Sequence, residues 1–383
     1  MPRTEWSDLL LTKMKTIGDP PADAIIQRLV EEKGAEAVHA FFHTLITNIR
    51  MPVQDIPESV RPFLQATSQL PEWADPDLMQ TAHDYFVDHG PKWLLLLYFK
   101  SLPILYACGD GALVLTRTGR LAHDAESLRV FSRRIAETGQ FLLDVMSKDA
   151  FDTPGSRGFE AIQKVRLIHA SIRQFVQAGG WDTDKHGLPV NQLHMAGTLM
   201  TFSIALIDGL QQFGIEESGD RQMAYLHRWQ VIGTLLGVSD DGLPADIPSA
   251  RSLLDAFVAR EAHENQPGKH LAAALVDFGK QAIPKERFDA APQLLIQYLA
   301  GNELASMIGV APAPGCLARV LPGAVLRVFG LVEKLEDRHS LVQTVLDKIS
   351  VQIMRFMVQY FREEKGVRFR IEGFEPGVFL NER

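Results

Sequence analysis

Residues 165–176 read VRLIHASIRQFV, and their apolar members return every three or four positions. This period places Val165, Ile172 and Val176 on one face of an α-helix, and His169 lies on the same face. A strand would instead alternate apolar and polar residues. The segment therefore predicts an amphipathic helix with a histidine on its buried side.

The helical period continues through most of the chain, for example across residues 128–145. Breaks rich in Pro and Gly, such as 18–21 (GDPP) and 179–180 (GG), separate the periodic segments. Only residues 367–371 (VRFRI) read as a possible strand. The sequence predicts an all-α fold built as one large helical domain with short connections.

Composition excludes several broad classes of protein. The chain has 383 residues, of which 46% are hydrophobic and 22% charged, so it can bury a large core. Lys and Arg number 39 against 47 acidic residues, a net charge of −8, which argues against a general nucleic-acid binder. The only cysteines, Cys108 and Cys316, exclude a disulfide framework and a four-cysteine zinc site.

The N-terminus shows no signal peptide, because acidic residues appear early and no apolar run follows. The most apolar stretch, residues 93–99, is too short to span a bilayer, which needs about 20 residues. We expect a cytoplasmic protein without a transmembrane segment. Nucleotide-binding loops, the nucleophile elbow and the zincin motif are absent from the sequence.

Two short patterns are candidate metal motifs. Glu36-x-x-His39 and Glu336-x-x-His339 match the spacing of di-iron helical bundles, although such a site also needs a Glu from each of two other helices. The dipeptides His83-Asp84 and His123-Asp124 match the HD pair of metal-dependent helical phosphohydrolases. Neither pattern identifies the remaining ligands, and chance adjacency or a solvated helix face is the favoured explanation of both.

His169 is the most informative single residue. A buried imidazole must form a hydrogen bond or coordinate a metal, because burying it unsatisfied costs about 1–3 kcal/mol. Arg166 and Arg173 lie three residues before and four after it, on adjacent turns of the same helix. A hydrogen-bonded core histidine explains the position, and so does a haem ligand with two cations for the propionates.

A second helical segment, residues 132–146, carries Arg134 and Thr138 on one face. Thr138 in mid-helix either bonds back to its own turn or faces a ligand. Gly139 favours close approach of another helix or of a flat ligand.

Several ordered stretches of the chain resemble the latex-clearing-protein and MpaB-type oxygenases, an all-helical family that holds haem b. The resemblance covers roughly residues 90 to 330. The matching stretches are Ser101-Leu102-Pro103 with Tyr106, Thr118-Gly119-Arg120-Leu121, Arg134-x-x-x-Thr138, residues 164–170 (KVRLIHA), Asn191-Gln192, Gly197-Thr198, Thr201-Phe202-Ser203, His227-Arg228-Trp229, Gly233 and Leu236-Gly237.

This resemblance implies that His169 is the proximal ligand of haem iron and that Arg134 and Thr138 border the haem. Some rubber-cleaving members have a lysine just before the motif threonine, where this chain has Glu137. Glu137 is therefore a candidate acid or base, or else a surface residue. His194 and His227 are the alternative iron ligands. Secreted members of the family carry an export signal, and the sequence of this chain shows none. We therefore expect that extracellular rubber is a poor candidate for its substrate.

The resemblance further implies a globin-like haem core with extra peripheral helices. We expect an N-terminal helical extension at 1–75, an oxygenase-like core at 76–335 and a C-terminal helix and tail at 336–383. The implied activity is a haem b-dependent oxygenase that uses dioxygen on a C=C bond of an apolar, isoprenoid-like small molecule. A non-catalytic haem sensor or carrier and an HD-type phosphohydrolase are the alternatives. The sequence leaves the oligomeric state undetermined.

Overall fold

The computed structural model describes residues 5–48, 51, 55–117, 125–282 and 289–311. Helices make up most of these residues, and no named strand occurs among them; the sole extended pairing there is one isolated bridge between Cys108 and Ala262. The prediction of an all-α fold is confirmed. The possible strand at 367–371 and the tail at 336–383 lie outside the described residues, and the predicted domain boundaries stay predictions.

The first half of the fold consists of helices from α1 to α10. They are α1 (Asp8–Met14), α2 (Pro20–Lys33), α3 (Ala35–Thr47), η2 (Glu58–Val60), α4 (Arg61–Ala66), α5 (Pro76–His89), α6 (Lys92–Leu96), the π-helical turn η3 (Leu97–Ser101), α7 (Leu102–Ala107), α8 (Gly109–Arg117), α9 (Ala125–Met146) and α10 (Arg157–Ala178).

The second half consists of helices from α11 to α18. They are α11 (Thr183–His186), α12 (Gln192–Phe202), α13 (Ile204–Gln212), α14 (Gly219–Leu235), η4 (Asp240–Gly242), α15 (Ile247–Glu261), α16 (Gln266–Ala282), α17 (Ala291–Ala300) and α18 (Asn302–Met307).

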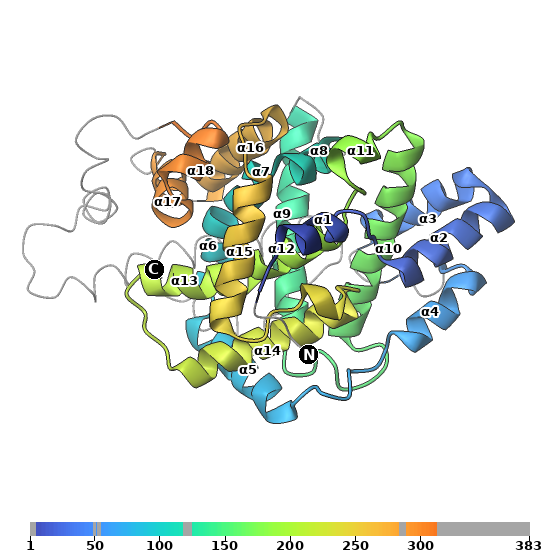
Figure 1. The fold of residues 1–383 in the computed structure, drawn as a ribbon, viewed down its shortest axis with the longest axis horizontal. Helices are drawn as coiled ribbons and strands as arrows, with labels where there is room; N and C mark the ends of the chain where they lie inside the picture. Colours follow the sequence, from blue (N-terminus) through green and yellow to red (C-terminus); the bar gives the residue numbers. More distant parts are fainter. Residues whose placement is uncertain (1–4, 49–50, 52–54, 118–124, 283–288, 312–383) are drawn as a thin grey trace, which may run out of the picture.

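Helix α10 separates two parts of the core. On one side α2, α3 and α4 pack together against it, and these N-terminal helices form one flank of the molecule (Figure 1). Their apolar side chains, among them Leu29, Phe41 and Phe63, form a cluster with Leu167 of α10. Burial of this cluster fixes the N-terminal helices to α10, because apolar surface removed from water contributes about 25 cal/mol per Å².

The main core lies on the other side of α10, around α12. Trp93 of α6 stacks on Tyr225 of α14, with 4.6 Å between ring centroids, and both rings are fully buried. Residues 192–212, which comprise α12 and α13, form the one described stretch that is long and apolar enough to cross a membrane. The fold buries 89% of its apolar window, so the stretch packs as a core segment.

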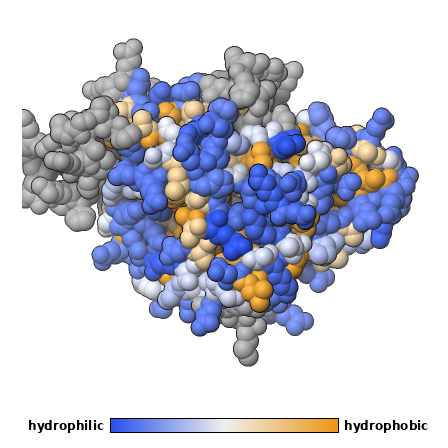
Figure 2. Space-filling view, turned by 45° about the horizontal axis from the view of Figure 1, so that its top comes forward, coloured by the Kyte–Doolittle hydropathy of each residue, from blue (hydrophilic) through white to orange (hydrophobic). Residues whose placement is uncertain are grey.

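The surface of the molecule is mostly polar. Figure 2 shows hydrophilic residues over much of one face, with apolar residues scattered among them in small groups. Large exposed apolar side chains among the described residues include Leu9 and Trp73. Single exposed apolar residues of this kind are common on globular proteins.

Candidate functional site

Helix α10 presents His169 as a neutral imidazole. The helix begins after Ser156 and ends before Gly179, so His169 lies near its middle, where the backbone is fully hydrogen-bonded. Burial and then the positive charge of Arg173 lower the pKa of His169 to about 3. The ring is therefore uncharged at neutral pH, which is the form that binds a metal ion.

The two ring nitrogens of His169 have different surroundings. Nδ1 is buried and has no hydrogen-bond partner among the described residues. Nε2 also forms no hydrogen bond there, but it is not among the enclosed atoms, and the residue as a whole is half-buried. An imidazole with an unpaired Nε2 is able to donate the lone pair of that atom to a metal ion.

The two alternative histidines are both engaged. Nε2 of His194 lies 3.2 Å from a carboxylate oxygen of Glu261. Nε2 of His227 accepts a hydrogen bond of 3.0 Å from the backbone N–H of Asp75, and its ring meets Trp73 edge-on. Of the three candidate ligands, His169 is the one whose ring nitrogens have no hydrogen-bond partner within the described part of the chain.

Helix α9 carries the Arg134–Thr138 pair, as predicted from the helical spacing. The hydroxyl of Thr138 donates to the backbone carbonyl of Arg134 at 2.8 Å, so in this rotamer it offers only acceptor capacity to a ligand. Arg134 is half-buried, and its positive charge opposes the rise that burial causes in the pKa of Tyr106 on α7.

Glu137 also lies on α9 and is paired. Its carboxylate accepts a hydrogen bond of 3.0 Å from Nε of Arg133, whose Nη2 in turn donates to the carbonyls of Ile46 and Thr47 at the end of α3. The side chain of Glu137 is 21% exposed. In this arrangement Glu137 supports the contact between α9 and α3.

Arg166 and Arg173 bind carboxylates of the protein itself, whereas the sequence predicted that they bind haem propionates. Arg166 forms two hydrogen bonds with Asp19, and its guanidinium lies over the Phe63 ring. Nε of Arg173 donates to Asp23 at 2.6 Å. These pairs attach α10 to the N-terminal segment, and a role for either arginine toward propionates stays a prediction.

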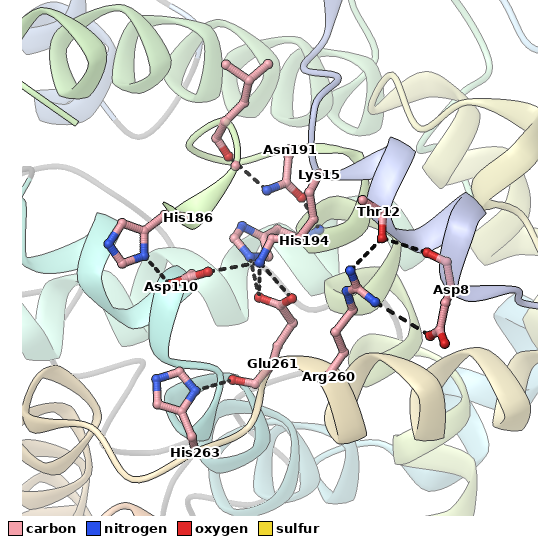
Figure 3. A network of polar contacts seen from close by, with 12 residues as sticks. Asp8, Thr12, Lys15, Asp110, His186, Asn191, His194, Arg260, Glu261 and His263 are labelled. Atoms are coloured by element: carbon pink, nitrogen blue, oxygen red, sulfur yellow. Dashed lines mark hydrogen bonds and ion pairs between the residues drawn. The ribbon is translucent and has the colours of Figure 1, made fainter. Parts of the chain in front are cut away.

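A second cluster of polar side chains lies between α8, α12 and α15. Donor atoms of Asp110, His194 and Glu261 lie within 4.8 Å of one another, which is close enough to hold a metal ion. However, Nζ of Lys15 lies 3.0 Å from carboxylate oxygens of both acids (Figure 3). His186 also binds Asp110, at 2.6 Å. Since an ammonium group already occupies the position between the carboxylates, we assign the cluster as an ion-pair network.

The sequence-predicted metal patterns do not form clusters among the described residues. Nδ1 of His83 is bonded to the carbonyl of Met146, and Asp84 accepts from Gln80. His39 stacks on Phe175 with 4.1 Å between centroids. The second copies of the patterns, at His123-Asp124 and Glu336–His339, lie outside the described residues.

Comparison with known proteins decides the family. A family model described as the catalytic domain of the ER-bound oxygenase mpaB/B'/Rubber oxygenase matches residues 108–334, more than half of the chain. The chain belongs to this oxygenase family. The matched stretch includes α9, with Arg134 and Thr138, and α10, with His169.

Individual relatives agree with the family match. A rubber oxygenase from Streptomyces sp. is 26% identical over 368 residues, which cover 93% of this chain and 85% of the relative. The solved structure of latex clearing protein LCP in the closed state matches with a TM-score of 0.70 at 21% identity, covering 93% of this chain and 94% of that chain. At this identity the structural match shows a shared fold.

Two residues outside the family match were missed by sequence reasoning. Asp19 and Asp23, which bind the arginines of α10, precede residue 108, and the GDPP stretch around Asp19 read only as a break between helices. Pro20 at the first turn of α2 was the available signal, since Asp before Pro is a common helix start. It gave no indication of a partner 147 residues away.

Proposed function

We propose that this member of the oxygenase family is a haem b-dependent enzyme that uses dioxygen to cleave or oxidise a C=C bond of an apolar, isoprenoid-like substrate. His169 is the proposed proximal ligand to the haem iron. The observation that carries the proposal is the state of this imidazole: neutral, half-buried, and unpaired at both ring nitrogens within the described residues.

The surroundings of His169 fit a haem ligand. A ligating histidine binds the metal through one ring nitrogen and usually donates a hydrogen bond from the other. Neither ring nitrogen of His169 is engaged by another described residue, so the ring is free to bind iron. Helices α9 and α10 pack against each other, which places Arg134 and Thr138 on the helix next to that of His169. When bound, haem iron would supply the reaction with dioxygen, chemistry that protein side chains lack.

The chain's own residues would bind and shield the reactants. The half-buried Arg134 is a candidate cation for the haem edge, and the acceptor oxygen of Thr138 is a candidate polar contact. The helical walls around α10 are rich in apolar side chains such as Ile172 and Val176, which favour an apolar substrate and exclude water. Glu137 is the proposed acid or base, provided that it leaves Arg133 during turnover.

The visible absorption spectrum of the purified protein tests the proposal directly. We expect a Soret band that shifts on reduction and again on addition of carbon monoxide, which requires an open coordination position. A colourless protein after expression with added haem precursor overturns the proposal. Incubation of the haem-loaded protein with oxygen and an unsaturated isoprenoid, followed by product analysis, separates an oxygenase from a haem sensor or carrier.

A further inference from the structure

Two hydrogen bonds hold the guanidinium of Arg173 in the turn of α10 that follows His169. It lies four residues after His169, hence on the same face of α10. Nε donates to Asp23 at 2.6 Å and Nη1 donates to the carbonyl of Val190 at 2.8 Å. Nη2 is buried and has no partner among the described residues, a state that it shares with Nδ1 of His169.

The residue whose carbonyl accepts a hydrogen bond from Arg173, Val190, has a strained backbone conformation. Val190 has φ of 49°, the only positive value at a described residue other than glycine, and β-branched residues rarely adopt it. Such a conformation costs about 1–3 kcal/mol and persists only when its surroundings enforce it. On the other side, a Cβ at Gly18 would lie 2.6 Å from a carboxylate oxygen of Asp23 and 2.9 Å from Cδ of Arg173.

The charges of Arg173 and Asp23 differ in how strongly they act on His169. The side chain of Arg173 is 3% exposed and that of Asp23 is 35% exposed. Water therefore screens the carboxylate more than the guanidinium. The positive charge of Arg173 reaches the imidazole, while Asp23 both holds Arg173 in place and partly offsets its charge.

We propose that Asp23 is a positioning residue that acts through Arg173 to set the electrostatic environment of the iron ligand His169. This inference rests on the proposed haem function. A positive charge beside the axial imidazole disfavours the ferric state, which carries one more positive charge than the ferrous state, and so raises the reduction potential. Asp23 acts in the opposite direction because it carries the compensating negative charge.

The test is the midpoint potential of the haem-loaded full-length protein, measured by spectroscopic redox titration. Asp23→Asn removes the negative charge, so we expect a higher potential than in the wild type. Arg173→Gln removes the positive charge, so we expect a lower one. Glu32→Gln, an exposed charge change on the same helix α2, is the matched control and should leave the potential unchanged.

Opposite shifts distinguish this role from a purely structural one. If Asp23 and Arg173 only stabilised the fold, both substitutions would loosen the same pocket and shift the potential in the same direction; that result overturns the inference. Should Asp23→Asn fail to retain haem, Arg173→Lys, which keeps the charge, is compared with Arg173→Gln. A lower potential in Arg173→Gln alone supports the action of the guanidinium charge on His169, on which the role of Asp23 depends, and equal potentials overturn the inference.

The failure of this inference is distinguishable from failure of the proposed function. A wild-type protein that binds no haem overturns both. A wild-type protein that binds haem, with variants that shift in the same direction or do not shift, overturns only the role of Asp23. Asp23→Glu provides the rescue, because a restored carboxylate is expected to return the potential toward the wild-type value.

Discussion

Arg166 binds Asp19 through two hydrogen bonds, of 2.8 and 2.7 Å, although 147 positions separate the two residues. Asp19 is 1% exposed and Arg166 is 6% exposed. The pair connects the start of α2 to the turn of α10 that precedes His169. A buried guanidinium and carboxylate in this bidentate geometry neutralise each other, and neither tolerates loss of its partner.

The first prediction concerns this pair. Asp19→Asn should lower the free energy of unfolding by about 3–5 kcal/mol, because it leaves the charge of Arg166 buried without a counter-ion. The control is Asp208→Asn, which breaks the ion pair between Asp208 and Arg251. The side chain of Asp208 is 30% exposed and that of Arg251 is 39% exposed. That change should cost only about 0–1 kcal/mol. Urea unfolding measures both, and equal losses would contradict the assigned burial of the Asp19 pair.

The second prediction concerns the glycine that makes room for Asp19. Gly237 has φ of +84°, and an added Cβ would lie 2.6 Å from a carboxylate oxygen of Asp19. Gly34 has nearly the same φ, +82°, but an added Cβ would meet nothing within 4 Å. Gly34→Ala should therefore cost only backbone strain, about 1–3 kcal/mol, because φ of 82° with ψ of 169° is a region that essentially only glycine adopts.

Gly237→Ala should cost clearly more, because the strain of its positive φ is joined by a clash with a carboxylate that Arg166 holds in place. The two unfolding free energies, measured side by side in urea, provide the comparison. A loss in Gly237→Ala no greater than that in Gly34→Ala would show that Asp19 moves away freely.

The third prediction concerns acid stability. Burial acts to raise the pKa of Glu261, but hydrogen bonds from His194 and Lys15 outweigh burial and lower the pKa to about 2, against 4.5 for the unperturbed group. A depressed folded-state pKa stabilises the fold fully above the unfolded-state pKa. This stabilisation is lost as the pH falls from about 4.5 to about 2.

Glu261→Gln should thus be less stable than the wild type at pH 7, by about 3 kcal/mol from the size of the pKa shift. The difference should shrink progressively below pH 4.5. Urea unfolding at pH 7, 4 and 3 measures it. A stability difference that stays constant over this range would mean that Glu261 has an ordinary pKa.

The fourth prediction separates the candidate iron ligands. His169→Ala should abolish the haem spectrum, since the unpaired Nε2 is the proposed ligand atom. His194→Ala should retain it, because His194 is bonded to Glu261 within the ion-pair network. The Soret absorbance per protein after reconstitution is the measurement. Loss of haem in His194→Ala with retention in His169→Ala would transfer the ligand role to His194.

The fifth prediction concerns Glu137. A role in proton transfer predicts that Glu137→Gln slows turnover of an accepted substrate about 10²-fold or more. Arg133→Gln is the control, because it removes the ion-pair partner of Glu137 but keeps the carboxylate. Unchanged turnover in Glu137→Gln would restrict Glu137 to the contact between α9 and α3.

The helical period of the sequence was sufficient to predict the all-α fold and the positions of α9 and α10. Periodicity is a local property, since residues three and four apart share a face in any α-helix. It placed His169 beside Ile172 and Val176, and the structure buries both. The same local reasoning placed Arg134 and Thr138 together, because their relation needs no knowledge of distant residues.

Tertiary structure alone decided which histidine is left without a partner and what the flanking arginines bind. Asp19 and Asp23 reach Arg166 and Arg173 across 147 and 150 residues, and Lys15 reaches Glu261 across 246. Such pairs form because packing of the N-terminal helices against α10 brings the charges together after the chain has folded. A sequence lists charges in order along the chain, whereas desolvation and Coulomb attraction depend on their separation in space.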